Sequence, residues 1–147
     1  MANVKIWVHA IWSTKRRKPL LIKKVRPIIF NHIRENARSK SIHLDFINGY
    51  IEHVHCLISL NHDQNISKVI QLIKGESSYW INKNHLTKKQ FAWQDEYMAI
   101  SVNPTRLNNL REYIKNQETH HIKKSFTQEY QKFINECSSD NTLKTKG

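Results

Sequence analysis

Residues 53–60 have the sequence His-Val-His-Cys-Leu-Ile-Ser-Leu, a segment without glycine or proline. Its alternation predicts a β-strand, in which successive side chains point to opposite faces of a sheet. One face carries four apolar side chains, Val54, Cys56, Ile58 and Leu60. The other face carries His53, His55, Leu57 and Ser59. The strand is therefore expected to bury its even-numbered face in a core and to present two imidazoles together on the opposite face.

The segments around this strand predict further strands and helices. The predicted strands are residues 4–12, 42–51, 53–60 and 91–102, and the predicted helices are residues 20–38, 66–84 and about 103–120. The first helix is expected to begin near Lys24, because Pro27 suits the first turn of a helix. Asn103 is a suitable N-cap for the third helix, and Pro104 suits its first turn.

This order of elements, βαββαβ followed by a helix, predicts an α+β fold of the ferredoxin-like or RRM-like type. In that fold two helices cover one face of a four-stranded antiparallel sheet, and here a C-terminal helix carrying Tyr113 is added. We expect the opposite face, with His53 and His55, to stay free for a ligand or partner. A length of 147 residues suits one domain. We expect it to span residues 1–126, with a partly helical and then flexible tail over residues 127–147.

The charge of the chain favours a polyanionic partner. The sequence has 24 Lys and Arg residues against 12 Asp and Glu residues, a formal net charge of +12. Such a surplus attracts nucleic acid more often than an anionic membrane surface. The positive residues are partly clustered, and the main block is Lys15, Arg16, Arg17 and Lys18. We expect this block to contact phosphates.

The composition excludes several other classes. The chain is 39% hydrophobic, which is enough for a core, but no apolar run approaches the roughly 20 residues of a membrane span. Its start lacks the hydrophobic core of a signal peptide. Its two cysteines, Cys56 and Cys137, do not make a disulfide framework or a cysteine-based zinc site. We expect a cytoplasmic protein without a membrane partner, associated with the nucleoid when bound to DNA.

Two pairs of residues carry candidate chemistry. His53 and His55 lie two positions apart in a strand, so their imidazoles emerge from one face as ready metal ligands. Tyr113 and Gln117 lie four positions apart and share a helix face. A tyrosine can be a covalent nucleophile when a metal polarises the electrophile, and glutamine can lend a ligand oxygen. Each pair alone is more often a set of ordinary surface residues. Together with the charge, they describe a metal-assisted tyrosine nuclease.

Several segments together resemble one protein family over roughly residues 4–126. The segments are TKRRKPL at residues 14–20, GYIEHVHCLIS at 49–59, KVIQLIKGESS at 68–78, Trp93-Gln94 with Tyr97 and Ser101-Val102, and YIKNQETHH at 113–121. In this order and spacing they resemble the single-tyrosine transposases of small bacterial insertion sequences, in the HUH (His-hydrophobic-His) nuclease superfamily. One departure is Glu52, which precedes the first histidine where Asp is more usual.

The resemblance implies a mechanism and a set of roles. His53, His55 and Gln117 would hold one divalent metal ion, Mg²⁺ or Mn²⁺. Tyr113 would attack the scissile phosphate of DNA and form a 5′-phosphotyrosine intermediate, which is then rejoined to a 3′-hydroxyl. The positions of three other residues leave two roles open. Glu52 either supports a ligand histidine or is a plain charge at the strand end, and His120 and His121, on the helical side of Tyr113, either contact DNA or are solvated.

The resemblance also implies partners. The substrate would be single-stranded DNA with hairpins near the ends of an element, bound through the basic block Lys15, Arg16, Arg17 and Lys18. Related enzymes are homodimers, in which the tyrosine helix can complete the active site of the partner subunit. If the helices are exchanged here, Tyr113 and Gln117 of one chain meet His53 and His55 of the other.

Two alternatives stay open on the sequence. The first is a domesticated relative that cuts hairpin DNA for its host, which would keep every catalytic residue. The second is a catalytically silent nucleic-acid-binding module, because RNA-recognition domains have a similar sheet. Those domains need aromatic residues on the central strands, where this chain has His53 and His55. A metal-storage role has little support, because the proposed site has few ligands.

Overall fold

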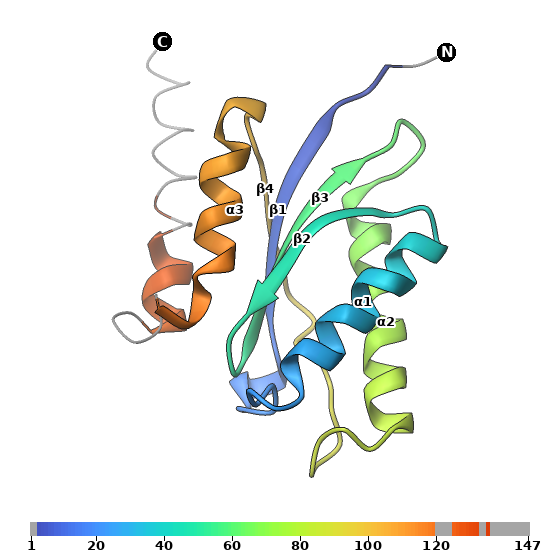
Figure 1. Cartoon of the computed structure of the whole chain (residues 1–147), viewed down its shortest axis with the longest axis vertical. Coiled ribbons are helices and arrows are strands. Elements are labelled where there is room, and N and C mark those ends of the chain that lie inside the picture. Colours follow the sequence, from blue (N-terminus) through green and yellow to red (C-terminus); the bar gives the residue numbers. More distant parts are fainter. Residues whose placement is uncertain (1–2, 120–124, 133–134, 136–147) are drawn as a thin grey trace. The chain divides into compact units, whose positions relative to one another are not determined.

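The computed structural model describes residues 3–119, 125–132 and 135, and Figure 1 shows the path of the chain. It forms two compact units, Met1–Gln117 and Glu118–Gly147, and each is described by itself. The elements of the first unit are β1 (Ile6–Ser13), η1 (Lys15–Arg17), α1 (Arg26–Ser39), β2 (His43–Gly49), β3 (His53–Leu60), α2 (Ile66–Lys83), β4 (Met98–Ser101), η2 (Pro104–Arg106) and α3 (Leu107–Lys115). In the second unit, residues 126–132 are helical. The predicted βαββαβ order is confirmed.

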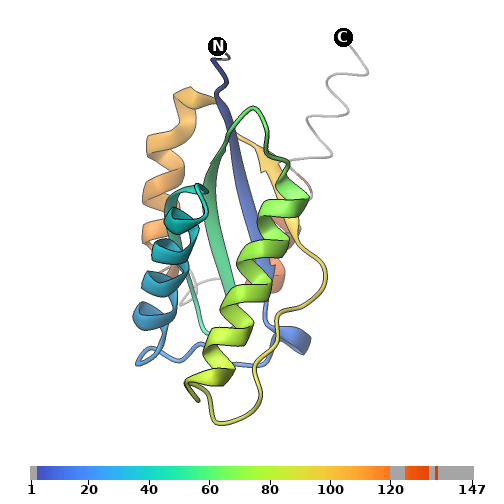
Figure 2. The ribbon, with the colours of Figure 1, turned by 90° about the vertical axis from the view of Figure 1, so that its right-hand side faces the viewer.

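The four strands form one antiparallel sheet in the order β2-β3-β1-β4. The two central strands, β3 and β1, pair along their whole length from Ile6 opposite Leu60 to Ser13 opposite His53. Figures 1 and 2 show α1 and α2 on one face of the sheet and α3 on the other. The expectation of a free second face is therefore wrong, because α3 covers the face that carries His53 and His55.

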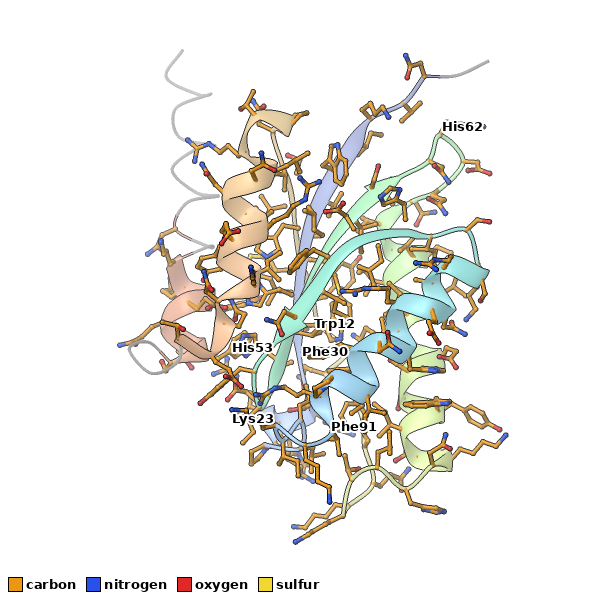
Figure 3. All side chains as sticks on the ribbon, in the orientation of Figure 1. Trp12, Lys23, Phe30, His53, His62 and Phe91 are labelled. Atoms are coloured by element: carbon orange, nitrogen blue, oxygen red, sulfur yellow. The ribbon has the colours of Figure 1, made fainter. Side chains whose placement is uncertain are left out.

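The main core lies between the sheet and helices α1 and α2. It includes the even face of β3, as predicted, and the even face of β1. Its strand residues are Val8, Ala10, Trp12, Val54, Cys56, Ile58 and Leu60, and its helix residues include Ile29, Phe30, Ile33, Val69, Ile70 and Ile73. Figure 3 shows Trp12, Phe30 and Phe91 in this layer. Burial raises the pKa of the Cys56 thiol far above its usual range, which fits a plain core residue.

The helix starts follow the local signals. Pro27 lies in the first turn of α1, as predicted, and the Asn65 side chain caps α2 by accepting a hydrogen bond from the Lys68 amide. Asn103 also acts as a cap, but it precedes the short helix η2, and α3 begins only at Leu107. The predicted start of the third helix is thus correct as the start of helical structure, although its first turn is 3₁₀.

The fourth strand is shorter than predicted. Only Met98–Ser101 pairs with β1, whereas residues 91–97 run as an irregular segment that makes one isolated bridge, Trp93 with Thr14. The segment is still anchored, since Phe91 and Trp93 are buried and the Trp93 indole N–H donates to the Ser77 hydroxyl at 2.8 Å. The apolar residues that alternate from residue 91 onward are therefore buried as anchors of an irregular segment, and not because they belong to a hydrogen-bonded strand.

Candidate active site

The two predicted metal-ligating histidines lie where β3 begins. His53 is the first residue of the strand and pairs with Ser13 of β1, while His55 pairs with Ile11. Both imidazoles are fully buried, and they offer ligand atoms within 4.8 Å of one another. Figure 3 shows His53 at this end of the sheet. The period-two geometry of the strand brings the pair together as expected.

Helix α3 is attached to the sheet by polar contacts at its middle. The Arg111 guanidinium donates to both carboxylate oxygens of Asp45 on β2, at 2.7 and 3.2 Å, and this hydrogen bonding raises the pKa of Arg111. The same guanidinium lies 5.8 Å from the centre of the Trp7 ring on β1. A bidentate pair with an aromatic contact fixes orientation as well as position.

The last turn of α3 is attached through a second strand residue. The Asn48 amide of β2 donates to the carbonyl oxygens of Ile114 and Lys115, at 3.1 and 3.0 Å. These carbonyls would otherwise lack partners at a helix end, so the amide acts as a cap supplied by the sheet. The Ile114 side chain is fully buried. Together with the Arg111 contacts, these two hydrogen bonds fix the position of α3 on the sheet.

Because α3 is held in this way, its two predicted functional residues meet the histidines of the same chain. The Tyr113 ring lies edge-on to His55, with ring centres 5.9 Å apart. Gln117, just beyond α3, places its side-chain oxygen 3.0 Å from Nε2 of His53 and is fully buried. The structure therefore brings Tyr113, Gln117, His53 and His55 together, although they come from segments about 60 residues apart in the sequence.

Two neighbouring contacts orient the His53–Gln117 pair. Nδ1 of His53 lies 2.7 Å from a carboxylate oxygen of Glu52; with Nδ1–H as the donor, Nε2 keeps its lone pair. The Gln117 amide nitrogen donates to the carbonyl oxygen of Tyr113 at 3.4 Å, which turns the amide oxygen toward His53. In this tautomer two lone pairs face each other across 3.0 Å, an arrangement that a cation between them stabilises, whereas with the proton on Nε2 the same contact is an ordinary hydrogen bond.

This donor set fits a small divalent cation. Two ligands at about 2.1 Å on adjacent corners of an octahedron are about 3.0 Å apart, which is the separation of the His53 and Gln117 atoms. Imidazole and amide-oxygen ligands suit Mn²⁺ and are compatible with Mg²⁺. His53, Gln117 and His55 are thus residues that can hold such an ion.

A further residue of this cluster, which was not predicted from the sequence, is His9 on β1. Its Nε2 lies 2.9 Å from Nδ1 of His55, the two rings are near-parallel with centres 5.1 Å apart, and only 3% of its surface is exposed. The alternation of residues 4–12 puts His9 on the odd-numbered face of the strand, so this local pattern could have signalled it. Its contact with His55 could not be predicted without knowing that β1 pairs with β3 and in which register.

The basic block lies beside the same end of β3. Lys15, Arg16 and Arg17 form η1 and are exposed, as is Lys18. The backbone before them is tied to the histidine strand, because the Thr14 amide donates to the Glu52 carbonyl at 2.8 Å.

The loop that carries the basic block has a defined shape. Arg16 and Arg17 have φ values of 58° and 54°, in the left-handed region that non-glycine residues seldom adopt. The loop is held by the segment that replaces the start of the predicted fourth strand: the Lys15 amide donates to the Ala92 carbonyl at 2.9 Å, and the Arg16 amide to the Gln94 side chain at 3.3 Å. These contacts present four positive side chains on a fixed support.

Two of the predicted site residues, His120 and His121, lie outside the described residues. Within the described part of the chain, no helix is both long and apolar enough to cross a membrane.

The chain is similar to known transposases in sequence. The sequence profile of the family described as "Transposase IS200 like" matches residues 2–117. The ISDra2 transposase TnpA of Deinococcus radiodurans is 24% identical over 114 residues, which cover 74% of this chain and 81% of that protein. The family match spans nearly all of the first unit, including the histidine strand and the residues of α3.

Two solved structures share the fold. A crystal structure of a protein assigned as a transposase in D. radiodurans R1 has a TM-score of 0.64 at 23% identity, covering 79% of this chain and 93% of that one. The structure of the REP-associated tyrosine transposase bound to a REP hairpin has a TM-score of 0.62 at 17% identity, covering 82% of this chain and 72% of that one.

Proposed function

Because the chain belongs to the IS200-like transposase family, we propose that it cleaves and rejoins single-stranded DNA through a 5′-phosphotyrosine intermediate, in a reaction that requires a divalent cation. The observation that carries the proposal is the meeting of the Gln117 oxygen, Nε2 of His53 and the Tyr113 ring beside His55. A silent binding module has no need for two facing ligand atoms next to a tyrosine. The cluster therefore favours an enzyme.

In this proposal each residue has one task. His53, His55 and Gln117 hold the cation, and Glu52 keeps the proton of His53 on Nδ1, so that Nε2 stays a ligand. When bound, a cation such as Mg²⁺ or Mn²⁺ supplies Lewis-acid polarisation of the scissile phosphate. Tyr113 is the nucleophile.

The reaction balances without an external energy source. The phenolic oxygen of Tyr113 forms a bond to phosphorus while the bond from phosphorus to O3′ breaks. The phenol loses a proton and the departing O3′ gains one, so the products are a 5′-phosphotyrosine link and a free 3′-hydroxyl. Attack by the same or another 3′-hydroxyl on this link restores the tyrosine. Attack by a different 3′-hydroxyl gives strand transfer.

DNA binding is assigned to the basic block. Lys15, Arg16, Arg17 and Lys18 are exposed beside the start of β3, so a strand whose phosphates contact them runs toward His53. We propose a DNA hairpin as the bound form, supported by the relative solved with a REP hairpin. His120 and His121 follow the nucleophile in the sequence and are proposed as further DNA contacts.

The proposal includes a homodimer, as the family resemblance implies. The contacts of Asp45 and Asn48 with α3 support a site assembled within one chain. Exchange of tyrosine helices is tested by mixing Tyr113→Phe protein with His53→Ala protein. Assembly within one chain predicts that the mixture stays inactive. Recovered cleavage in the mixture would show that one subunit supplies Tyr113 to the histidines of the other.

The proposed function is tested by covalent trapping. Labelled single-stranded hairpin oligonucleotides from the flanks of the gene are incubated with the protein and Mn²⁺ or Mg²⁺, and adducts are separated on denaturing gels. We expect an adduct that EDTA abolishes and that Tyr113→Phe lacks. Tyr79→Phe is the matched control, because Tyr79 is 66% exposed on α2. Tight hairpin binding without any adduct would favour the silent binding module, and an adduct in Tyr113→Phe would mean that another tyrosine is the nucleophile.

A further inference from the structure

The strongest unassigned feature of the fold is the buried contact between His9 and His55. We propose that His9 is a positioning residue, whose ring nitrogen accepts the Nδ1–H of His55 and so holds His55 in the tautomer that can bind a metal through Nε2. The proposal rests on the proposed function, because it assigns a support to one of its ligands. His9 itself touches neither metal nor DNA in this scheme.

The geometry leaves two arrangements of one proton. Nε2 of His9 and Nδ1 of His55 are 2.9 Å apart, and two bare lone pairs at that distance repel. If His9 donates, Nδ1 of His55 is the acceptor, and a neutral His55 then carries its proton on Nε2 and cannot ligate. If His55 donates, its Nε2 keeps a lone pair. A metal-binding His55 therefore requires His9 as the acceptor.

The position of His9 suits a fixed acceptor. It lies on β1, a central strand, where its partners in register are Leu57 on one side and Ile100 on the other. Its ring lies edge to edge with that of His55, at an interplanar angle of 24°. A side chain packed in this way in the middle of a sheet has little freedom to turn, so it holds both the proton and the ring plane of His55.

The two ligand histidines then have equivalent supports of different charge. His53 has the Glu52 carboxylate on its Nδ1 at 2.7 Å, and His55 has a neutral imidazole at 2.9 Å. Ligating histidines generally donate their second N–H to a partner that fixes the tautomer and orientation, and loss of that partner weakens metal affinity about 10- to 100-fold. His9 supplies this function from a different strand, without adding a negative charge.

The first test reads the tautomer of His55 in the full chain without metal. Two-bond ¹H–¹⁵N correlation spectra of protein labelled with ¹⁵N-histidine distinguish a protonated Nδ1 from a protonated Nε2. We expect His55 protonated on Nδ1 in the wild type and in His9→Gln, whose amide oxygen can replace the acceptor. In His9→Leu the preference should be lost. A wild-type His55 protonated on Nε2 would overturn the proposal, whatever the variants do.

The second test measures Mn²⁺ binding by electron paramagnetic resonance. We expect His9→Leu to bind Mn²⁺ about 10- to 100-fold more weakly than wild type, His9→Gln to recover most of that loss, and the adduct rate of His9→Leu to approach wild type at saturating Mn²⁺. His62→Leu is the control, since His62 is exposed at the other end of the sheet (Figure 3). Equal Mn²⁺ affinity of His9→Leu and wild type would refute the positioning role.

The two tests separate the inference from the proposed function. A wild-type chain that binds no Mn²⁺ would refute the proposed metal site. The metal-free spectra would still decide whether His9 sets the tautomer of His55.

Discussion

Gly49 is the position where a single added carbon is expected to disturb the candidate site most directly. It is the last residue of β2 and pairs with Val54, next to the first histidine. A Cβ at this position would lie 2.2 Å from the carbonyl oxygen of His53 and 3.0 Å from the Cα of Val54. Both atoms are backbone, so no side chain can rotate away to make room.

The size of the effect follows from these distances. A carbon and a carbonyl oxygen come no closer than about 3.3 Å, so Gly49→Ala must move the His53 backbone by about 1 Å. Overpacking of this kind costs about 1–3 kcal/mol of stability. A shift of about 1 Å in a catalytic group can lower a rate by about 100-fold. We therefore expect Gly49→Ala to remain folded but to form the phosphotyrosine adduct about 100-fold more slowly.

The assay pairs adduct formation with urea unfolding, and Gly75→Ala is the matched control. Gly75 lies in α2, and a Cβ there would meet nothing within 4 Å. The control should keep the wild-type rate and gain up to about 1 kcal/mol of stability from the higher helix propensity of alanine. The reasoning fails if Gly49→Ala forms the adduct at the wild-type rate, because the His53 backbone would then tolerate the displacement.

Two further predictions concern the support of α3 and the basic loop. Arg111→Met should lower the free energy of unfolding by about 1 kcal/mol and slow adduct formation several-fold. A double-mutant cycle with Asp45→Asn should show a coupling energy of about 0.5–1 kcal/mol. A coupling energy of zero would mean that the pair does not hold the helix. The double variant Lys15→Ala/Arg17→Ala should reduce the steepness of the plot of log affinity against log salt concentration by about 1.4 for single-stranded DNA. The control variant Arg38→Ala/Lys40→Ala, at two exposed positions, should leave this slope unchanged. An equal reduction of the slope in both double variants would argue against a specific role for the loop.

The elements that could be predicted from the sequence are those whose signals are local. The bounds of β3 match its alternation residue for residue, and α2 starts beside its Asn65 cap as the pattern indicates. The fourth strand failed for the opposite reason. Phe91 and Trp93 alternate and are buried, but whether such a segment forms a strand depends on a neighbouring strand edge, which no local pattern encodes.

The second face of the sheet was expected to be free because the βαββαβ fold places its two helices on the other face, and this expectation was wrong. The apolar stripe of α3 is thin, and only Ile114 is buried among its residues. The helix covers the sheet nonetheless, because Arg111 pairs with Asp45 and the Asn48 amide donates to the carbonyl oxygens at the end of the helix. Hydrophobic periodicity detects helices that dock through apolar area. It does not detect one that docks through paired polar groups.

The candidate site is also held together by polar contacts between different elements. His9, His53, His55 and Gln117 are polar yet are at most 3% exposed, and buried polar groups are tolerated when they have partners. His9 and His55 lie within hydrogen-bond distance of each other, and His53 lies within hydrogen-bond distance of Glu52 and Gln117. Sequence spacing finds pairs on one element, such as His53 with His55 and Tyr113 with Gln117. A partner on another strand, such as His9, follows only from strand order and register, so the residues that orient a ligand are harder to predict than the ligands themselves.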